Sequence, residues 1–330
     1  MATAFEIVKQ DRKKLVEKII SNMEKGYIFS NSLWSKNMLT PHNPSSNTTY
    51  KGSNRFRLLF AEDENGYQDS RWLTYKQAND LGYKVKKGEK GTLLEKWIWT
   101  KEEKTINENG EEETKTVELS KPIVNYFIVY NADQIDGISK EEVKKMEESE
   151  ITKTADNFIK SSLCNIEEKY QDKSYYSPTD DKIILPPRNT FKNDKAFLSV
   201  LLHEMSHSTA KEGRIDRNIR NFFGTEEYAK EELRAELSSY FILSDLRIEN
   251  NETSVDHSNY LKSWIQVLKN DSNELFRISN ESNAISEFLI ENYENVLKRQ
   301  EIHNNVKENN IISNIKIKIN AINTAEEEER

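Results

Sequence analysis

The chain has almost no cysteine and no long apolar run. A single cysteine, Cys164, stands among 330 residues, which excludes a disulfide framework and a zinc site built from cysteines. No run approaches the 18 apolar residues of a membrane helix, and the N-terminus MATAFEIVKQDRKKL lacks the apolar core of a signal peptide. We therefore expect a cytoplasmic protein with no membrane partner.

An excess of positive charge is also missing. The net charge is −8, with 35% apolar and 32% charged residues. Such a balance argues against a protein that coats duplex DNA along its whole length, although it leaves room for a local basic groove. The length allows one large domain or two.

The pattern of apolar residues changes along the chain. Residues 5–25 have apolar positions at helical spacing. From Tyr27 to about Ala132, β-type runs such as RFRLLF, GTLLEKWIWT and PIVNYFIVYNA alternate with turn clusters, and the polar stretch 101–116 is predicted to be a long solvated hairpin loop. Beyond 138–150 we expect a helix over about 151–169, a strand at KIIL, and helices to about 298.

These patterns predict an α+β protein of two domains. We expect a small β-rich domain over residues 1–140, a linker over 141–151 and a mostly helical domain over 152–300. The polar, asparagine-rich tail over 301–330 is predicted to be partly disordered, although its IKIKI segment alternates like an edge strand.

Two of the five histidines lie four residues apart in LLHEMSHST, residues 201–209. On a helix, His203 and His207 face the same side and can share one metal ion, while Glu204 points about 100° away. The preceding AFLSVLLH is apolar on nearly every face, so this helix should be buried, where unpaired charges cost several kcal/mol. We predict that both histidines bind Zn²⁺ and that Glu204 is the general base. Two ordinary core histidines are the alternative.

A second helix is predicted in GTEEYAKEELRAELSSYFILSDL, with Thr225 as its N-cap. A helical projection puts Glu231 on the solvated face but Glu232 and Glu236 in the apolar arc, where surface glutamates are not expected. Catalytic zinc sites usually have three protein ligands. We predict Glu232 as the third ligand and Glu236 as acceptor of a histidine N–H. Exchanged roles, or buried salt bridges, are the alternatives.

Three weaker candidates surround this predicted site. Tyr228, one turn before Glu232, is placed to stabilise an oxyanion. His257 is a candidate transition-state donor or substitute ligand, with a structural role as the favoured alternative. The strand at KIIL is expected to line the substrate cleft.

The N-terminal half combines aromatic residues with cations. Residues 50–101 contain eleven Lys or Arg against seven Asp or Glu, and stacking surfaces beside cations suit single-stranded DNA. A small β-rich core with a solvated lysine face is the alternative. The candidate DNA-binding residues are Tyr50, Lys51, Asn54, Arg55, Arg57, Trp72, Tyr75, Lys76, Lys84, Lys86, Lys87 and Lys90.

Several blocks resemble the ArdC-type anti-restriction proteins of plasmids and other mobile elements. Over about 152–295, the resemblance to the family's metallopeptidase domain is carried by DKIILPPRNTF, LLHEMSHST, RIDRN, YAKEELRAELSSYF and NYLKSWIQVLKND. The family's N-terminal single-stranded DNA-binding domain is similar to YKGSNRFRLLF, WLTYKQANDLGYKVKKGEKGTLLEKW and YFIVYNADQIDGI. The insertion at 101–116 and the tail depart from the family pattern.

This resemblance implies a zincin-like C-terminal domain, bound zinc and single-stranded DNA as a partner. It also implies protection of incoming plasmid DNA from restriction endonucleases during conjugation. HEMSH followed by EELRAE is similar to zincins whose third ligand is the first Glu of an E-x-x-x-D/E/N turn, which favours Glu232 over Glu236.

Three functions compete on these grounds. The first is an anti-restriction protein that binds single-stranded DNA and carries a zinc peptidase. The second is a protease recruited by DNA to a DNA-bound protein or a restriction enzyme. The third is a DNA-binding protein with a structural metal, against which Glu204 argues, because a structural site needs no general base.

Overall fold

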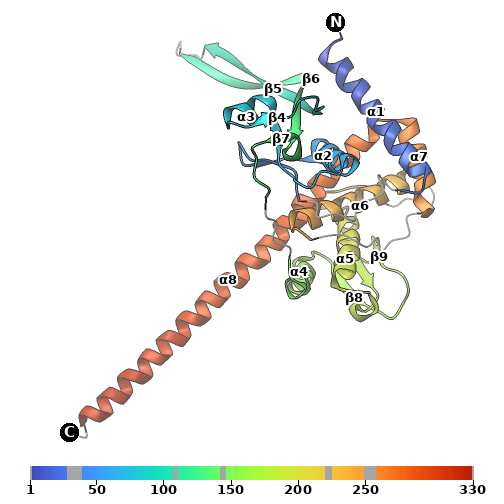
Figure 1. Cartoon of the computed structure of the whole chain (residues 1–330). Coiled ribbons are helices and arrows are strands. Elements are labelled where there is room, and N and C mark those ends of the chain that lie inside the picture. The colour runs from blue at the N-terminus through green and yellow to red at the C-terminus, as the bar shows by residue number, and fades with distance from the viewer. Residues whose placement is uncertain are drawn as a thin grey trace.

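The computed structural model describes residues 2–27, 39–106, 111–141, 146–219, 225–248 and 258–328 (Figure 1). Helices and strands mix throughout, so the predicted α+β class is confirmed. Among the described residues, no helix has both the length and the apolar character needed to cross a bilayer.

The N-terminal half combines three helices with a β-hairpin of long strands. Its elements are α1 (Ala4–Glu24), β1 (His42–Asn43), β2 (Thr48–Thr49), α2 (Gly52–Asn65), β3 (Trp72–Thr74), α3 (Tyr75–Asp80), β4 (Lys84–Val85), β5 (Thr92–Ile106), β6 (Glu112–Asn131) and β7 (Ile135–Asp136). The main sheet has the order β3-β6-β5 and is antiparallel, while β1 pairs with β2 and β4 with β7.

The described parts of the polar stretch, 101–106 and 112–116, form strands and not the predicted hairpin loop. Strands β5 and β6 pair from Thr92–Val129 to Ile106–Glu112, and the hairpin projects from the body (Figure 1). Alternating Lys, Thr and Glu residues tolerate a solvated ladder, because opposite charges meet across it, as in the 3.2 Å pair of Lys104 with Glu112.

The run RFRLLF is helical in α2 and not a strand. Its apolar residues Phe56, Leu59 and Phe60 recur at the i, i+3, i+4 spacing of one helix face and are all buried. Gly66 ends the helix with a left-handed φ of 70°. A short apolar run such as RFRLLF is compatible with a helix or with a strand. Gly66, which ends the helix, was the signal in the sequence that favoured a helix.

The C-terminal half is mostly helical. Its elements are α4 (Glu148–Ser161), β8 (Asn165–Glu168), β9 (Tyr175–Ser177), β10 (Lys182–Leu185), α5 (Asp194–Ser208), α6 (Glu226–Asp245), α7 (Ser258–Asn270) and α8 (Glu274–Glu328). The expected strand at KIIL is β10, which lies between parallel β8 and antiparallel β9. The helix expected over 151–169 ends early, at Ser161.

The polar tail belongs to helix α8. This helix extends away from the body to Glu328 (Figure 1), so the IKIKI segment is helical and not an edge strand. The sequence from Glu274 onward contains no proline and no glycine, and therefore no residue that stops a helix.

The two halves share one hydrophobic cluster. Val16 and Ile19 of α1 and Phe56 of α2 pack with Leu233 of α6 and Phe276 of α8, all of them buried. A second cluster joins α4, β10, α5, α6 and α8. The first 140 residues therefore share a hydrophobic cluster with helices of the C-terminal half.

A buried carboxylate connects elements from both halves. Glu95 of β5 accepts hydrogen bonds from Arg12 of α1, from Arg57 of α2 and from the Trp97 indole, at 2.5–3.1 Å. Arg12 also donates to Asn273, which lies between α7 and α8. Burial would raise the pKa of Glu95, but the two arginines lower it below its ordinary value.

Glu95→Gln is expected to destabilise the chain by about 3–5 kcal/mol, because it removes the buried carboxylate that pairs with the partly buried Arg12 and the buried Arg57 and leaves Arg57 with Asp11 alone. Urea unfolding measures this difference. The stabilisation should be complete above the ordinary glutamate pKa of about 4.3 and should decline as the pH falls below it.

Glu103→Gln is the matched control, because its ion pair with Lys101 is about half exposed and should contribute less than about 1 kcal/mol. Equal unfolding midpoints for the two variants would contradict the central position given to Glu95.

Candidate metal centre and nucleic-acid surface

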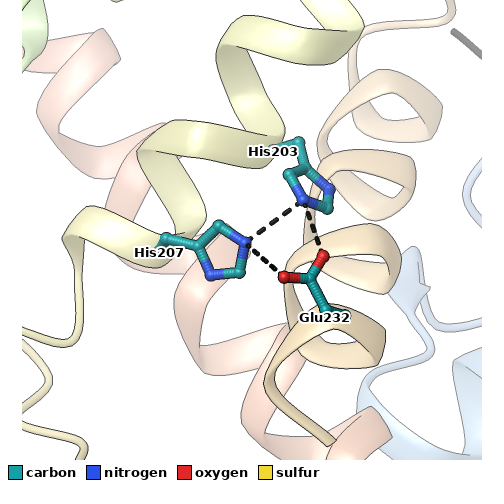
Figure 2. A group of neighbouring side chains, drawn as sticks. All are labelled: His203, His207 and Glu232. Atoms are coloured by element: carbon teal, nitrogen blue, oxygen red, sulfur yellow. Dashed lines mark hydrogen bonds and ion pairs between the residues drawn. The ribbon is translucent and has the colours of Figure 1, made fainter. Parts of the chain in front are cut away.

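Helix α5 places two imidazoles side by side. It begins where the Asn193 side chain accepts the backbone N–H of Ala196, and its apolar residues pack on all sides. His203 and His207, one turn apart, both face α6, and their Nε2 atoms lie 3.2 Å apart (Figure 2).

Helix α6 brings Glu232 to the same point. One carboxylate oxygen lies 3.4 Å from His203 Nε2 and the other 3.8 Å from His207 Nε2 (Figure 2). Donors bound at about 2.0–2.1 Å around a tetrahedral ion are about 3.4 Å from one another. Two neutral imidazoles that face each other through Nε2 share at most one proton in a hydrogen bond. A divalent cation therefore fits this set of donors.

Two further carboxylates of α6 lie beside the outer nitrogens of the histidines. A carboxylate oxygen of Glu236 lies 3.4 Å from His203 Nδ1, on the side of the imidazole away from Glu232. Glu231 lies 3.2 Å from His207 Nδ1 and pairs with Arg217 at 2.9 Å. Such contacts orient the imidazoles so that both Nε2 atoms point inward.

The predicted solvated position of Glu231 is wrong, because its side chain is only 6% exposed. The projection assumed that α6 has one buried face, but this helix is covered by α5 on one side and by α7 and α8 on others. The partner that keeps the Glu231 carboxylate buried, besides His207, is the Arg217 guanidinium.

The charges around the pair of histidines reinforce one another. Burial opposes protonation of His203, yet Glu232 and Glu236 raise its pKa well above the ordinary value. The pKa of His207 is likewise raised against burial, by Glu231 and Glu232. Although burial raises the pKa of Glu232, the two histidines lower it to about 2. The site thus holds an ionised Glu232 carboxylate beside two imidazoles, and the surrounding carboxylates favour a positive charge at this point.

Glu204 lies beside His203, His207 and Glu232 but is not one of the three residues whose ligand atoms converge. Its side chain is buried, and burial raises its pKa, although the two histidines act in the opposite direction. The backbone N–H of Tyr176, in strand β9, donates to its carboxylate. A carboxylate whose pKa is raised is suited to exchanging protons.

A cavity of about 820 Å³ opens onto these residues. Its walls include Tyr175 and Tyr176 of β9, Tyr228 of α6 and Tyr260 of α7. The expected strand KIIL does not form this wall; it is the buried centre of its sheet, and the edge strand β9 lines the cavity instead.

Tyr228 reaches the site, while His257 lies outside the described residues. The Tyr228 hydroxyl is hydrogen-bonded with Glu232 and with Tyr260. Burial, followed by the charge of Glu232, raises the pKa of Tyr228, so this phenol keeps its proton and can donate it in a hydrogen bond.

Three predicted DNA-binding residues are buried in the fold. Arg55 is 3% exposed, pairs with Asp245 of α6 and donates to the Phe241 carbonyl. Arg57 binds Glu95, and Trp72 is fully buried with its indole N–H on Glu62. Their prediction as DNA contacts was wrong. A cation next to an aromatic residue in the sequence is typical of a nucleic-acid surface, but it is equally typical of a buried charge in a protein core.

Three other candidates already have partners in the chain. Asn54 forms two hydrogen bonds with the backbone of Glu95, and the Tyr50 hydroxyl lies 3.4 Å from the Trp72 carbonyl. Lys51 is exposed but pairs with Glu287 at 2.6 Å.

The remaining candidates are exposed and close together in the chain. They follow β3 directly or lie around β4, and they are Tyr75, Lys76, Lys84, Lys86, Lys87 and Lys90. Lys86 also donates to the Asp133 carbonyl. This lysine-rich part of the predicted nucleic-acid surface is therefore accessible to solvent.

The chain resembles known proteins over most of its length. Residues 9–130 match the N-terminal domain of anti-restriction factor ArdC, and residues 153–281 match a zincin-like metallopeptidase family. Two proteins named DNA primase TraC from Escherichia coli are 33% and 32% identical over 86% and 84% of the chain. The chain spans only 27% and 19% of their own length. The uncharacterized protein y4eC of Sinorhizobium fredii is 29% identical over 84% of the chain and 90% of its own length.

Two crystal structures of the antirestriction protein ArdC from plasmid R388 are similar to this fold, one metal-free and one with bound Mn(II). Each has a TM-score of 0.67 and 29% identity, and the match covers 86% of this chain and 98% or 97% of theirs. Both domains occur in the same chain and in the expected order. The chain therefore has an ArdC-like two-domain architecture, in which a match to the ArdC N-terminal domain is followed by a match to a zincin-like metallopeptidase domain.

Proposed function

We propose that this protein binds single-stranded DNA through its N-terminal half and hydrolyses peptide bonds at a zinc site formed by His203, His207 and Glu232. The convergence of these three ligand atoms within 4.8 Å of one another, beside a cavity, is the main support. Zn²⁺ suits two imidazoles and a carboxylate. The relative with bound Mn(II) makes Mn²⁺ the first alternative to test.

Glu204 distinguishes a catalytic site from a structural one. A bound divalent cation would polarise the substrate carbonyl and lower the pKa of water. The Glu204 carboxylate would take the proton of the attacking water and pass it to the leaving nitrogen. Tyr228, which keeps its own proton, would donate a hydrogen bond to the negative oxygen that develops on the carbonyl.

The proposed DNA partner follows from the exposed lysines. Residues 75–91 contain five lysines against two acidic residues, a local charge of +3 in a chain of −8. Neutralised phosphates release counterions, so binding should weaken as salt increases. We infer that the protein acts in the cytoplasm, where it shields incoming single strands of a mobile element from restriction.

Purified protein should bind about one equivalent of Zn²⁺, and His207→Ala should lose most of it. Glu204→Gln should keep the metal, because this side chain is proposed as a base and not a ligand. Elemental analysis after dialysis, repeated with Mn²⁺, measures both. Full occupancy in Glu232→Ala would reject Glu232 as the third ligand.

Glu231→Gln should weaken metal binding by about 10–100-fold, because the amide holds His207 Nδ1 less firmly than the carboxylate paired with Arg217 does. Competition with a chromogenic chelator gives the affinity. Glu227→Gln is the matched control on the same helix, since Glu227 is exposed and, among the ion pairs of the described residues, joins only Lys230. Equal affinities for both variants would refute the orienting role.

DNA protection and peptide hydrolysis should be separable. Glu204→Gln should bind single-stranded DNA normally and keep any protection that comes from covering the strand, since stacking and phosphate contacts need no metal. Combined Lys86→Gln and Lys87→Gln should reduce protection. Conjugation into a restricting recipient at matched expression tests this, with proteomic comparison of recipient proteins as the readout for hydrolysis. Loss of protection in Glu204→Gln at unchanged DNA affinity would make proteolysis the working mechanism.

A further inference from the structure

Strand β6 carries a row of partly exposed apolar side chains. Tyr126, Ile128 and Tyr130 occupy alternate positions and therefore share one face of the sheet. Tyr75, at the start of α3, extends the row, because its ring lies 6.5 Å from that of Tyr130 in an edge-to-face contact. We name these four residues the β6 stripe.

The opposite face of β6 packs into the core, whereas the β6 stripe is only partly covered, with Tyr130 packed against the small cluster of Leu73, Ala78 and Ile135. Val129 is fully buried and packs with Leu58, Trp72 and Leu94. In contrast, Tyr75 is 57% exposed, Tyr126 39% and Ile128 36%. A sheet face that leaves two tyrosine rings this accessible has surface available for a ligand.

The stripe has the chemistry and the spacing of a stacking platform. Alternate residues of a strand are about 6.8 Å apart, twice the 3.4 Å rise between stacked bases in a duplex strand. Side chains at that spacing suit bases that have been spread apart, one for each pair of residues. The two strand tyrosines, Tyr126 and Tyr130, are four residues and therefore about 13.6 Å apart, with the aliphatic Ile128 between them. Base stacking on aromatic rings tolerates any sequence, because every base has a π-face.

Cations border the stripe at its α3 end. The backbone of Gly91 lies so close to it that a Cβ there would be 2.3 Å from Ile128 and 3.1 Å from the Tyr130 ring. Lys90 is therefore at the edge of the stripe, and Lys84 is adjacent to Val85, which packs in the same small cluster as Tyr130. The nearby Glu89 carboxylate accepts a hydrogen bond from the Gln134 side-chain amide.

The geometry points to the β6 stripe as the surface on which single-stranded DNA lies, with Lys84 and Lys90 beside the phosphates. This inference rests on the proposed DNA binding and gives it a location. Of the four residues, only Tyr75 was among the candidates from sequence. A protein partner is disfavoured, because the adjoining segment 75–91 carries a charge of +3.

The test measures binding of the full chain to a fluorescent oligothymidine of about 16 nucleotides. Tyr126→Ala and Tyr75→Ala should each weaken binding at least about fivefold, with little change in its salt dependence. Tyr126→Phe, which keeps the ring, should bind like the wild type. Replacing Lys84 and Lys90 by Gln should instead flatten the salt dependence, by about 0.7 in log–log slope for each lysine.

Tyr170→Ala is the matched control, since this tyrosine is 89% exposed and lies in the metallopeptidase half. Unfolding midpoints confirm that the variants fold. If the wild type binds and the lysine variants weaken it while both tyrosine variants do not, the stripe is overturned and the proposed function stands. Absence of binding by the wild type overturns both, and equal affinity for duplex overturns the stacking surface.

Discussion

The burial of helix α6 on nearly all sides is the constraint on which the rest of this structure depends. A helix so enclosed must find a partner for each of its charges, because an isolated buried carboxylate is too costly to keep ionised. Its neighbour α5 supplies two histidines for Glu231, Glu232 and Glu236. On its other sides, Leu233 and Phe241 pack against helices from both ends of the chain. The candidate metal centre is thus formed by the same contacts that stabilise the fold.

Much of the metal centre could be predicted from the sequence, because its residues follow one helical period. The four-residue spacing of His203 and His207 brings both nitrogens to one side of α5, and the apolar surroundings of Glu232 indicate that it turns inward. Local periodicity carries this information. Glu231 escaped prediction because its partners, His207 and Arg217, come from distant segments that no local pattern relates to it.

The N-terminal half was harder to predict, and for a related reason. Arg55, Arg57 and Trp72 have the composition of a nucleic-acid surface, but their environment depends on Asp245, Glu95 and Glu62, respectively. Burial of a cation is decided by whether a carboxylate from elsewhere in the fold meets it. The alternating β6 stripe was visible in the sequence, but its exposed face became clear only once the neighbours of β6 were placed.

The shared hydrophobic cluster has a consequence for how the chain folds during synthesis. Val16 and Ile19 in α1 are buried in a cluster that contains residues of α6, α7 and α8 as well as Phe56 of α2, and Arg12 is bonded to Asn273, 261 residues further along. Contacts between such distant residues require the closure of long loops, which slows folding. On the ribosome, the first helix must therefore wait until almost the whole chain has emerged, with its apolar face exposed in the meantime.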